Sequence, residues 1–305
     1  MGGRRERTIF WSIAALLVAG AALAYRLLLG PSPGPPRVPA PSGGAPAAVR
    51  LTVAQTFGDV TIVRAGARSR AAPGDELRAD DALETAPGAR VVLDGAGYQV
   101  QLDEDGSFDV REITAELSRF RLAQGLVSAR VQDPGHAVEI EGDPGSVVRT
   151  RGGDLAVARS GGTVAVGVER GSAEFTASGG TVVLTAGQQS VAASGGRPSA
   201  PAPIPSSLLL KVTWPEERTT NHRRIVITGR TQPGAIVVLG EERVEVQPDG
   251  RFTHVIALRE GRQRLSARAR AVGGSASSEG PVILLDTRAP DPRFDTTDLW
   301  RRPRK

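Results

Sequence analysis

Residues 98–110 read YQVQLDEDGSFDV, and the alternation of apolar and polar residues in this stretch decides the fold class. Successive side chains of a β-strand point to opposite faces, so one face of the first strand carries Tyr98, Val100 and Leu102. Asp105-Gly106 is typical of a turn, and Phe-Asp-Val resumes the alternation after it. The stretch therefore predicts short strands joined by tight turns, with the hairpin as the local unit.

The next stretch, RFRLAQGLVSARV at residues 119–131, repeats this pattern. We expect a second hairpin with its turn at Gln124-Gly125. One alternative stays open just before it: Ile113, Leu117 and Phe120 also have the spacing of a helical face, so a short helix over residues 111–118 is a second interpretation.

A short repeat follows in the same region. Ser-Gly-Gly-Thr-Val occurs at 160–164 and again at 178–182, and a third Ser-Gly-Gly occupies 194–196. The spacing fits one two-strand unit per step, and glycine at the turns permits a positive φ. Residues 51–194, the first β region, are therefore predicted to be a stacked-hairpin, two-sheet β domain.

Residues 208–286, the second β region, contain about seven strand candidates at close spacing. Pro233-Gly234 and Asp249-Gly250 are the clearest turns between them. Short strands separated by such turns are typical of an antiparallel sandwich. The candidates are KVTW (211–214), RIVITG (224–229), AIVVLG (235–240), VEVQ (244–247), RFTHVIAL (251–258), RLSARARA (264–271) and PVILLD (281–286).

The N-terminus carries the pattern of a membrane anchor. Residues 8–29 are uncharged except for Arg26, and about 22 residues of helix span roughly 33 Å, enough to cross a bilayer. Arginines within residues 1–7 predict a cytoplasmic stub and export of the rest. The alternative is a cleaved secretory signal, with a processing site at Ala22-Leu23-Ala24 before Tyr25.

Three segments lack the apolar residues that a core needs. Residues 30–50 and 195–207 are rich in Pro, Gly, Ala and Ser, and we expect both to be linkers. Residues 287–305 are predicted to be a disordered basic tail. A sharper alternative for its end, Trp300–Lys305, is contact with an anionic lipid or polymer.

Composition excludes several function classes. The chain of 305 residues has no cysteine, which rules out disulfides, zinc–thiolate sites and thiol nucleophiles. The net charge of +5 is spread along the chain rather than concentrated in a block, so nucleic-acid binding is not expected.

Several motifs of the first β region resemble the FecR domain of bacterial envelope proteins. They are Gly74-Asp75, Thr85 before Gly88, the hairpin at Asp94-Gly95, and the late turns at Glu169-Arg170-Gly171 and Ala186-Gly187-Gln188. The family often has Arg-Gly-Thr where this chain has Arg151-Gly152-Gly153, a departure that leaves any role of that threonine without a counterpart. The resemblance implies that these positions specify the fold and not a functional site.

The second β region resembles a bacterial Ig-like domain through VITGRTQPGAIVVLG, PDGRFTHVIALREG and ILLDTRAPD. In FecR-type regulators a sizeable cytoplasmic segment binds a sigma factor. Here that segment is residues 1–7, too short for the roughly 800 Å² per side of a stable interface. The resemblance therefore implies the exported domains without the signalling output.

Reactive patterns are weak throughout the chain. His136, His222 and His254 have no metal-ligand spacing, and no HExxH, GxSxG or phosphate-loop motif occurs. Asp103-Glu104-Asp105-Gly106 with Asp109 lacks the spacing of a calcium loop, and Val100 replaces the third glycine of a dinucleotide fingerprint at Gly95-Ala96-Gly97. Asp80, Asp81 and Glu84 are the least implausible carboxylates for an unrecognised hydrolase or lyase.

The sequence thus predicts an all-β protein with one N-terminal transmembrane α-helix. It is expected to be a non-enzymatic binding or scaffold protein, single-pass in the bacterial inner membrane, with most of the chain in the periplasm. No catalytic, metal or cofactor-binding residue is assigned. The expected partners are an envelope protein or a glycan such as peptidoglycan. The alternative is a transmembrane signalling regulator related to FecR-type anti-sigma systems.

Overall fold

The structure, a computed structural model, describes residues 50–142 and 145–288. All regular elements in these residues are β-strands, which confirms the all-β class for this part of the chain. Within it, no helix has the length and apolarity needed to cross a membrane. The expected stub 1–7, membrane helix 8–29 and nearly all of the segments 30–50 and 287–305 lie outside the described residues.

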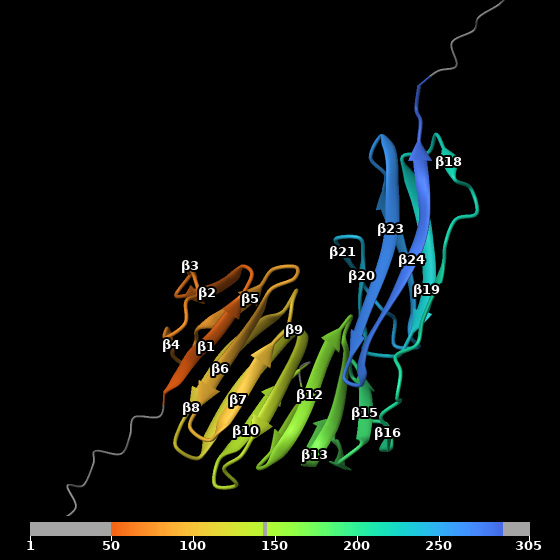
Figure 1. The fold of residues 1–305 in the computed structure, drawn as a ribbon. Helices are drawn as coiled ribbons and strands as arrows, with labels where there is room; N and C mark the ends of the chain where they lie inside the picture. The colour runs from red at the N-terminus through yellow and green to blue at the C-terminus, as the bar shows by residue number, and fades with distance from the viewer. Residues whose placement is uncertain (1–49, 143–144, 289–305) are drawn as a thin grey trace, which may run out of the picture. The chain divides into compact units, whose positions relative to one another are not determined.

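The first β region forms two sheets that share two strands (Figure 1). Sheet A runs β4 (Glu76–Leu77), β1 (Leu51–Phe57), β6 (Arg90–Gly95), β7 (Tyr98–Leu102), β9 (Leu117–Val131), β12 (Gly153–Ser160), β13 (Thr163–Ala177), β15 (Gln188–Ala193) and β16 (Ala202–Pro203). Sheet B runs β3 (Ala67–Arg70), β2 (Val60–Arg64), β5 (Ala82–Thr85), β8 (Ser107–Ile113), β9, β10 (Ala137–Glu141), β11 (Val147–Thr150), β13 and β14 (Gly180–Thr185). All these neighbours are antiparallel except β9 and β10.

The two shared strands correct the predicted hairpin at Gln124-Gly125. Strand β9 runs through this dipeptide: its first half pairs with β8 in sheet B, and its second half with β12 in sheet A. At Gly125 φ is 107°, and a Cβ would lie 2.7 Å from the Cα of Gly106, so glycine permits the strand to bend between sheets. Strand β13 crosses in the same way at Gly171, where a turn was also expected.

Two further predictions in this stretch are wrong. Residues 107–113 and 117–131 are both strands, so the alternative helix over 111–118 does not form. The turn before Gly106 exists, but it leads from sheet A into sheet B, so β7 and β8 do not pair as a hairpin. The chain changes sheets at this corner instead of folding back on itself.

The core of the first β region lies between the two sheets. Tyr98, Val100 and Leu102 are buried there, as their alternation predicts, together with side chains from sheet B. The rings of Phe108 and Phe120 stack with 4.9 Å between centroids. Burying such large side chains contributes about 2 to 3 kcal/mol each, which is how a region with few aromatics and no disulfide is held together.

The second β region is a two-sheet sandwich, as predicted. Ile227 and Phe252 lie in the core between the sheets. Sheet C contains β17 (Leu210–Thr213), β19 (Arg224–Thr231) and β22 (Arg251–Ala257), in that order. Sheet D runs β18 (Thr219–Thr220), β24 (Gly274–Leu285), β23 (Gly261–Ala271), β20 (Ile236–Leu239) and β21 (Glu242–Val244).

The described residues of the two β regions belong to one compact unit. The segment 195–207, expected to be a linker, is hydrogen-bonded along β15: the Ser199 amide donates to Val191 and the Ile204 amide donates to Gly187. A small apolar cluster joins alanines on the outer face of sheet A to Ile236 and Val272. The proposed boundaries at 194 and 208 stay predictions.

Candidate functional site

The three histidines lie in unrelated environments. His136 is buried, His222 is exposed in a loop, and His254 of β22 has its Nε2 2.7 Å from a Glu242 carboxylate oxygen. In residues 50–142 and 145–288, no three His, Asp or Glu side chains gather as a metal site would require. The structure therefore does not bring the histidines together.

His136 belongs to a buried polar chain that the sequence did not indicate. Its Nδ1 lies 3.0 Å from the Ala115 carbonyl oxygen, so Nδ1–H is the donor, and its Nε2 lies 3.1 Å from the Ser118 hydroxyl oxygen. The Ser118 hydroxyl donates to the Tyr98 hydroxyl at 2.7 Å. Burial raises the pKa of Tyr98, and its bond to Ser118 only partly offsets this. The chain is satisfied internally and closed to solvent, which is typical of a structural role.

The three candidate carboxylates do not form a catalytic pair. Asp80 is exposed at a positive φ of 69°. Asp81 is buried and accepts from the Arg64 guanidinium at 2.6 and 2.7 Å, whereas Glu84 pairs with Arg68. Burial alone would raise the pKa of the Asp81 carboxyl, but the hydrogen bonds from Arg64 and from the Arg78 amide outweigh it and hold the pKa below its usual range. Asp81 and Glu84 thus bind different arginines, and Asp80 faces solvent.

The acidic run at 103–105 faces an arginine rather than a cation site. Glu104 accepts from the Gly88 amide at 2.5 Å and pairs with Arg270 at 2.7 Å. Asp105 adopts a positive φ of 55° at the turn, and burial followed by its neighbour Glu104 raises the pKa of its carboxyl. The Arg243 guanidinium donates to the Asp105 carbonyl at 2.7 Å. This run therefore anchors side chains of the second β region.

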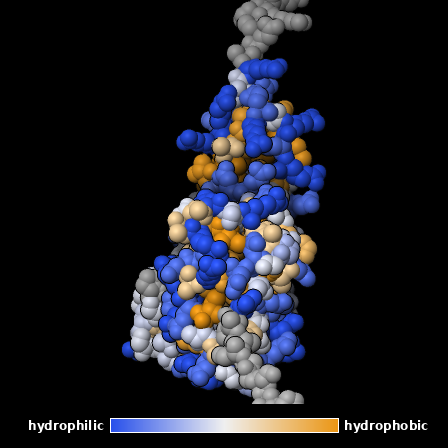
Figure 2. Space-filling model, turned by 90° about the vertical axis from the view of Figure 1, so that its left-hand side faces the viewer, coloured by the Kyte–Doolittle hydropathy of each residue, from blue (hydrophilic) through white to orange (hydrophobic). Residues whose placement is uncertain are grey.

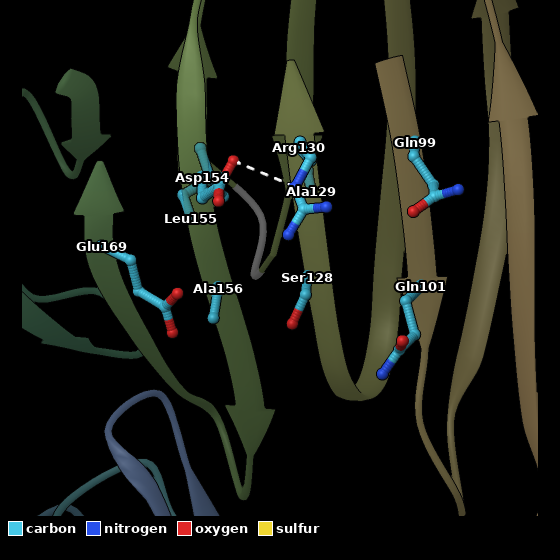
Figure 3. A pocket seen from close by; sticks show the side chains of 9 residues that line it. All are labelled: Gln99, Gln101, Ser128, Ala129, Arg130, Asp154, Leu155, Ala156 and Glu169. Atoms are coloured by element: carbon cyan, nitrogen blue, oxygen red, sulfur yellow. Dashed lines mark ion pairs between the residues drawn. The ribbon is translucent and has the colours of Figure 1, made fainter. Parts of the chain in front are cut away.

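A shallow depression crosses the outer face of sheet A (Figure 3). Its volume of about 120 Å³ is below the roughly 300 Å³ at which pockets begin to enclose a small molecule, so a ligand would lie across it. The lining residues come from four neighbouring strands, β7, β9, β12 and β13: Gln99, Gln101, Ser128, Ala129, Arg130, Asp154, Leu155, Ala156 and Glu169.

The polar groups in this depression are only partly used by one another. Asp154 binds two arginines, with Arg130 Nε at 3.4 Å and Arg170 Nε at 2.9 Å from its oxygens. Gln99 donates to Asp94 at 2.8 Å, which leaves its carbonyl oxygen free to accept. Glu169 is exposed and makes no hydrogen bond or ion pair to another residue that the structure describes. Amides, a hydroxyl, a guanidinium and a carboxylate thus line the depression together.

Sequence alternation placed Gln99 and Gln101 on the outward face, but it did not indicate their neighbours. Ser128 and Arg130 come from β9, which the sequence interpretation folded as half of a hairpin. The register that places Gln101 opposite Ser128 and Gln99 opposite Arg130 joins residues far apart in the chain. Only the pairing of β7 with β9 reveals this surface.

Exposed apolar side chains are scattered over the described surface. On the face that Figure 2 shows, hydrophobic residues appear as patches separated by hydrophilic ones. The large apolar side chains with substantial exposure are Phe57, Val183, Leu209, Val226, Val255 and Val282. Polar contacts therefore dominate what these surfaces offer to a partner.

No protein-family model and no curated protein matches the sequence. Among solved structures, two from Parabacteroides distasonis, each described as a "putative anti-sigma factor", share 15% and 20% identity. They cover 40% and 39% of this chain and 59% and 53% of their own, with TM-scores of 0.34 and 0.28. A polysaccharide lyase shares 10% identity over 80% of this chain and 40% of its own, with a TM-score of 0.20. These TM-scores are too low to carry an argument about function.

Proposed function

We propose that this chain is a single-span protein of the bacterial inner membrane whose FecR-like and Ig-like regions lie in the periplasm. There it binds or organises an envelope protein or a glycan and catalyses no reaction. The observation that carries the binding role is the polar depression over four strands of sheet A. Its flat form suits a partner that lies across the sheet, such as a glycan chain or a protein surface.

The interior of the first β region supports a role without catalysis. The one buried serine–histidine contact, Ser118 with His136, is used in an internal hydrogen-bond chain among the described residues. Asp81, the most buried of the candidate carboxylates, is held by Arg64. A nucleophile or base must reach its substrate, and these groups do not.

Site-specific photo-cross-linking in cells tests the binding role. A photoreactive residue at Ser128, in the depression, is expected to capture a reproducible partner that mass spectrometry or glycan analysis identifies. The control carries the same residue at Glu174, which is exposed on the outer face of sheet B. Equal capture at both positions, or no capture at Ser128, overturns the proposal for this face.

A second candidate is a transmembrane signalling regulator of the FecR type. It agrees with the names of the two Parabacteroides structures better than the scaffold role does, although their likeness carries no weight of its own. Deletion of residues 51–286 separates the candidates. A signalling regulator changes the transcription of a defined set of genes on this deletion, whereas a scaffold loses its cross-linked partner without that change.

A further inference from the structure

Sheet C carries a row of three cations on its exposed face. Lys211 of β17 lies directly opposite Arg230 of β19, and Arg230 lies directly opposite Arg251 of β22. All three residues are exposed. Neighbouring strands lie about 4.8 Å apart, so three positive charges line up across the sheet at that spacing.

This row is not explained by internal pairing. Lys211 and Arg230 make no ion pair or hydrogen bond through their side chains to any residue that the structure describes. Arg251 has one partner, Asp249, at 3.4 Å, and both side chains are largely exposed, so this pair is weak. Like charges directly opposite one another in a sheet repel. The free protein therefore keeps an unfavourable arrangement.

A row of hydroxyls runs beside the cations. Thr213, Thr228 and Thr253 are paired in register across the same three strands and are exposed. The cations and threonines together line an open depression of about 290 Å³. Farther along the face, Val226 lies opposite Val255, and Arg224 adds a fourth cation opposite Ala257. None of the strand residues on this face is acidic.

We propose that this face of sheet C is a binding site for an acidic polysaccharide, a linear glycan that carries carboxylate groups. Its chain would run across the strands, with carboxylates on the cation row and sugar hydroxyls on the threonine row. The face lacks the aromatic side chains on which the bases of a single-stranded nucleic acid stack. Its apolar residues, short valines and an alanine, do not form the large apolar wedge of a membrane-inserting surface.

The site differs from the depression on sheet A and does not rest on the binding role proposed there. A failure of cross-linking at Ser128 does not contradict the proposal for sheet C, because Ser128 belongs to the first β region. It gives the second β region a ligand of stated chemistry.

Binding of the full chain, kept in a neutral detergent, to immobilised polygalacturonate tests the proposal by biolayer interferometry. Each cation near an anionic surface contributes about fivefold to binding, so Arg230→Gln is expected to weaken it about fivefold and the triple Lys211→Gln, Arg230→Gln, Arg251→Gln variant about a hundredfold. Thr228→Val is expected to weaken binding with no change of charge. The matched control is Arg262→Gln, because Arg262 is an exposed cation of sheet D in the same sandwich.

Three outcomes overturn the proposal. The first is equal binding to neutral dextran, and the second is an equal loss of binding in Arg262→Gln and Arg230→Gln. The third is tighter binding to phosphatidylglycerol vesicles or single-stranded DNA than to polygalacturonate, which would assign the face to a membrane or a nucleic acid. Circular dichroism spectra that superimpose on that of the unmodified protein exclude misfolding of the variants.

Discussion

Arginine has opposite surroundings on two sheet faces of this protein: acidic neighbours on sheet B and basic neighbours on sheet C. On sheet B, the residues Glu112, Arg119, Glu139, Arg149 and Glu174 lie opposite one another in register on five neighbouring strands, so charges alternate in sign. Arg119 lies 3.1 Å from Glu112 and 2.9 Å from Glu139. On sheet C, the corresponding row is Lys211, Arg230 and Arg251, with one sign only.

The alternating charges of sheet B stabilise that sheet. The cations of sheet C repel one another, and an anionic ligand would relieve this repulsion. Opposite charges on neighbouring strands contribute roughly 0.2 to 1 kcal/mol per pair, and like charges cost a similar amount. An arginine-rich composition alone does not produce both patterns, because sheet B shows that carboxylates are available to complete a row. Changes to the two faces should therefore have opposite effects on folding stability.

The largest expected effect on stability is at Asp81, the buried carboxylate just before β5 that pairs with Arg64 of β2. Asp81→Asn is expected to lower the free energy of unfolding by about 2 kcal/mol at pH 7, because Arg64 loses an ionised partner at a buried position. Chemical denaturation measures the change. Asp80→Asn is the control, since Asp80 is exposed and asparagine tolerates its positive φ.

The same variant carries a pH dependence. The folded-state pKa of Asp81 is lowered, so its contribution is complete above the unfolded pKa of about 3.9 and is lost as the pH falls through the folded value. The stability difference between the protein and Asp81→Asn should therefore shrink in acid. A difference that stays constant from pH 7 to pH 2 contradicts this account of the buried pair.

A smaller loss is expected at the centre of the alternating row. Arg119→Gln should destabilise the protein by about 1 kcal/mol, because Glu139 is nearly buried and loses the guanidinium that donates to it. The loss is no larger because Arg119 is partly exposed and solvent screens its charge. Arg121→Gln is the matched control on the same strand and face, where no ion pair forms within the described residues. Equal losses in both variants would remove the distinction between the rows.

Sequence reasoning reached the strand pattern but not the registers that create these faces. The alternation at Tyr98, Val100 and Leu102 marked a buried face correctly, because periodicity is a local property. The hairpin predicted at Gln124-Gly125 was wrong, because a glycine with positive φ occurs in a bend within a strand as well as in a hairpin turn. Local sequence does not distinguish the two; the pairing partners of each half of the strand do.

The cation row could not be predicted either, because local sequence does not determine which strands pair or in which register. Lys211, Arg230 and Arg251 lie 19 residues (211 to 230) and 21 residues (230 to 251) apart, and each looks like an ordinary solvated residue of its strand. A register shift of one residue would turn Arg230 to the other face of sheet C. Composition did show a net charge of +5, but this charge is spread along the chain and gave no reason to expect a cluster.

Reversing the central charge of the cation row sharpens the comparison. Arg230→Glu gives sheet C the alternating signs of sheet B, so it is expected to raise the free energy of unfolding by about 0.5 kcal/mol. The same change should abolish binding to polygalacturonate. Denaturation and interferometry on one preparation test both effects. A variant that loses stability would show that Arg230 is held by contacts other than repulsion from its neighbours.

Added salt should move the two faces in opposite directions by a few tenths of a kcal/mol. At 0.5 M, roughly, the screening length falls to about 4 Å, so the pairs of Arg119 weaken while the repulsion across Arg230 is relieved. Hydrogen exchange resolves the faces separately: the amides of β10 should exchange faster in salt, and those of β19 more slowly. Faster exchange in both would mean that salt destabilises the whole fold. The two charge rows would then not contribute separately to the stability of their sheets.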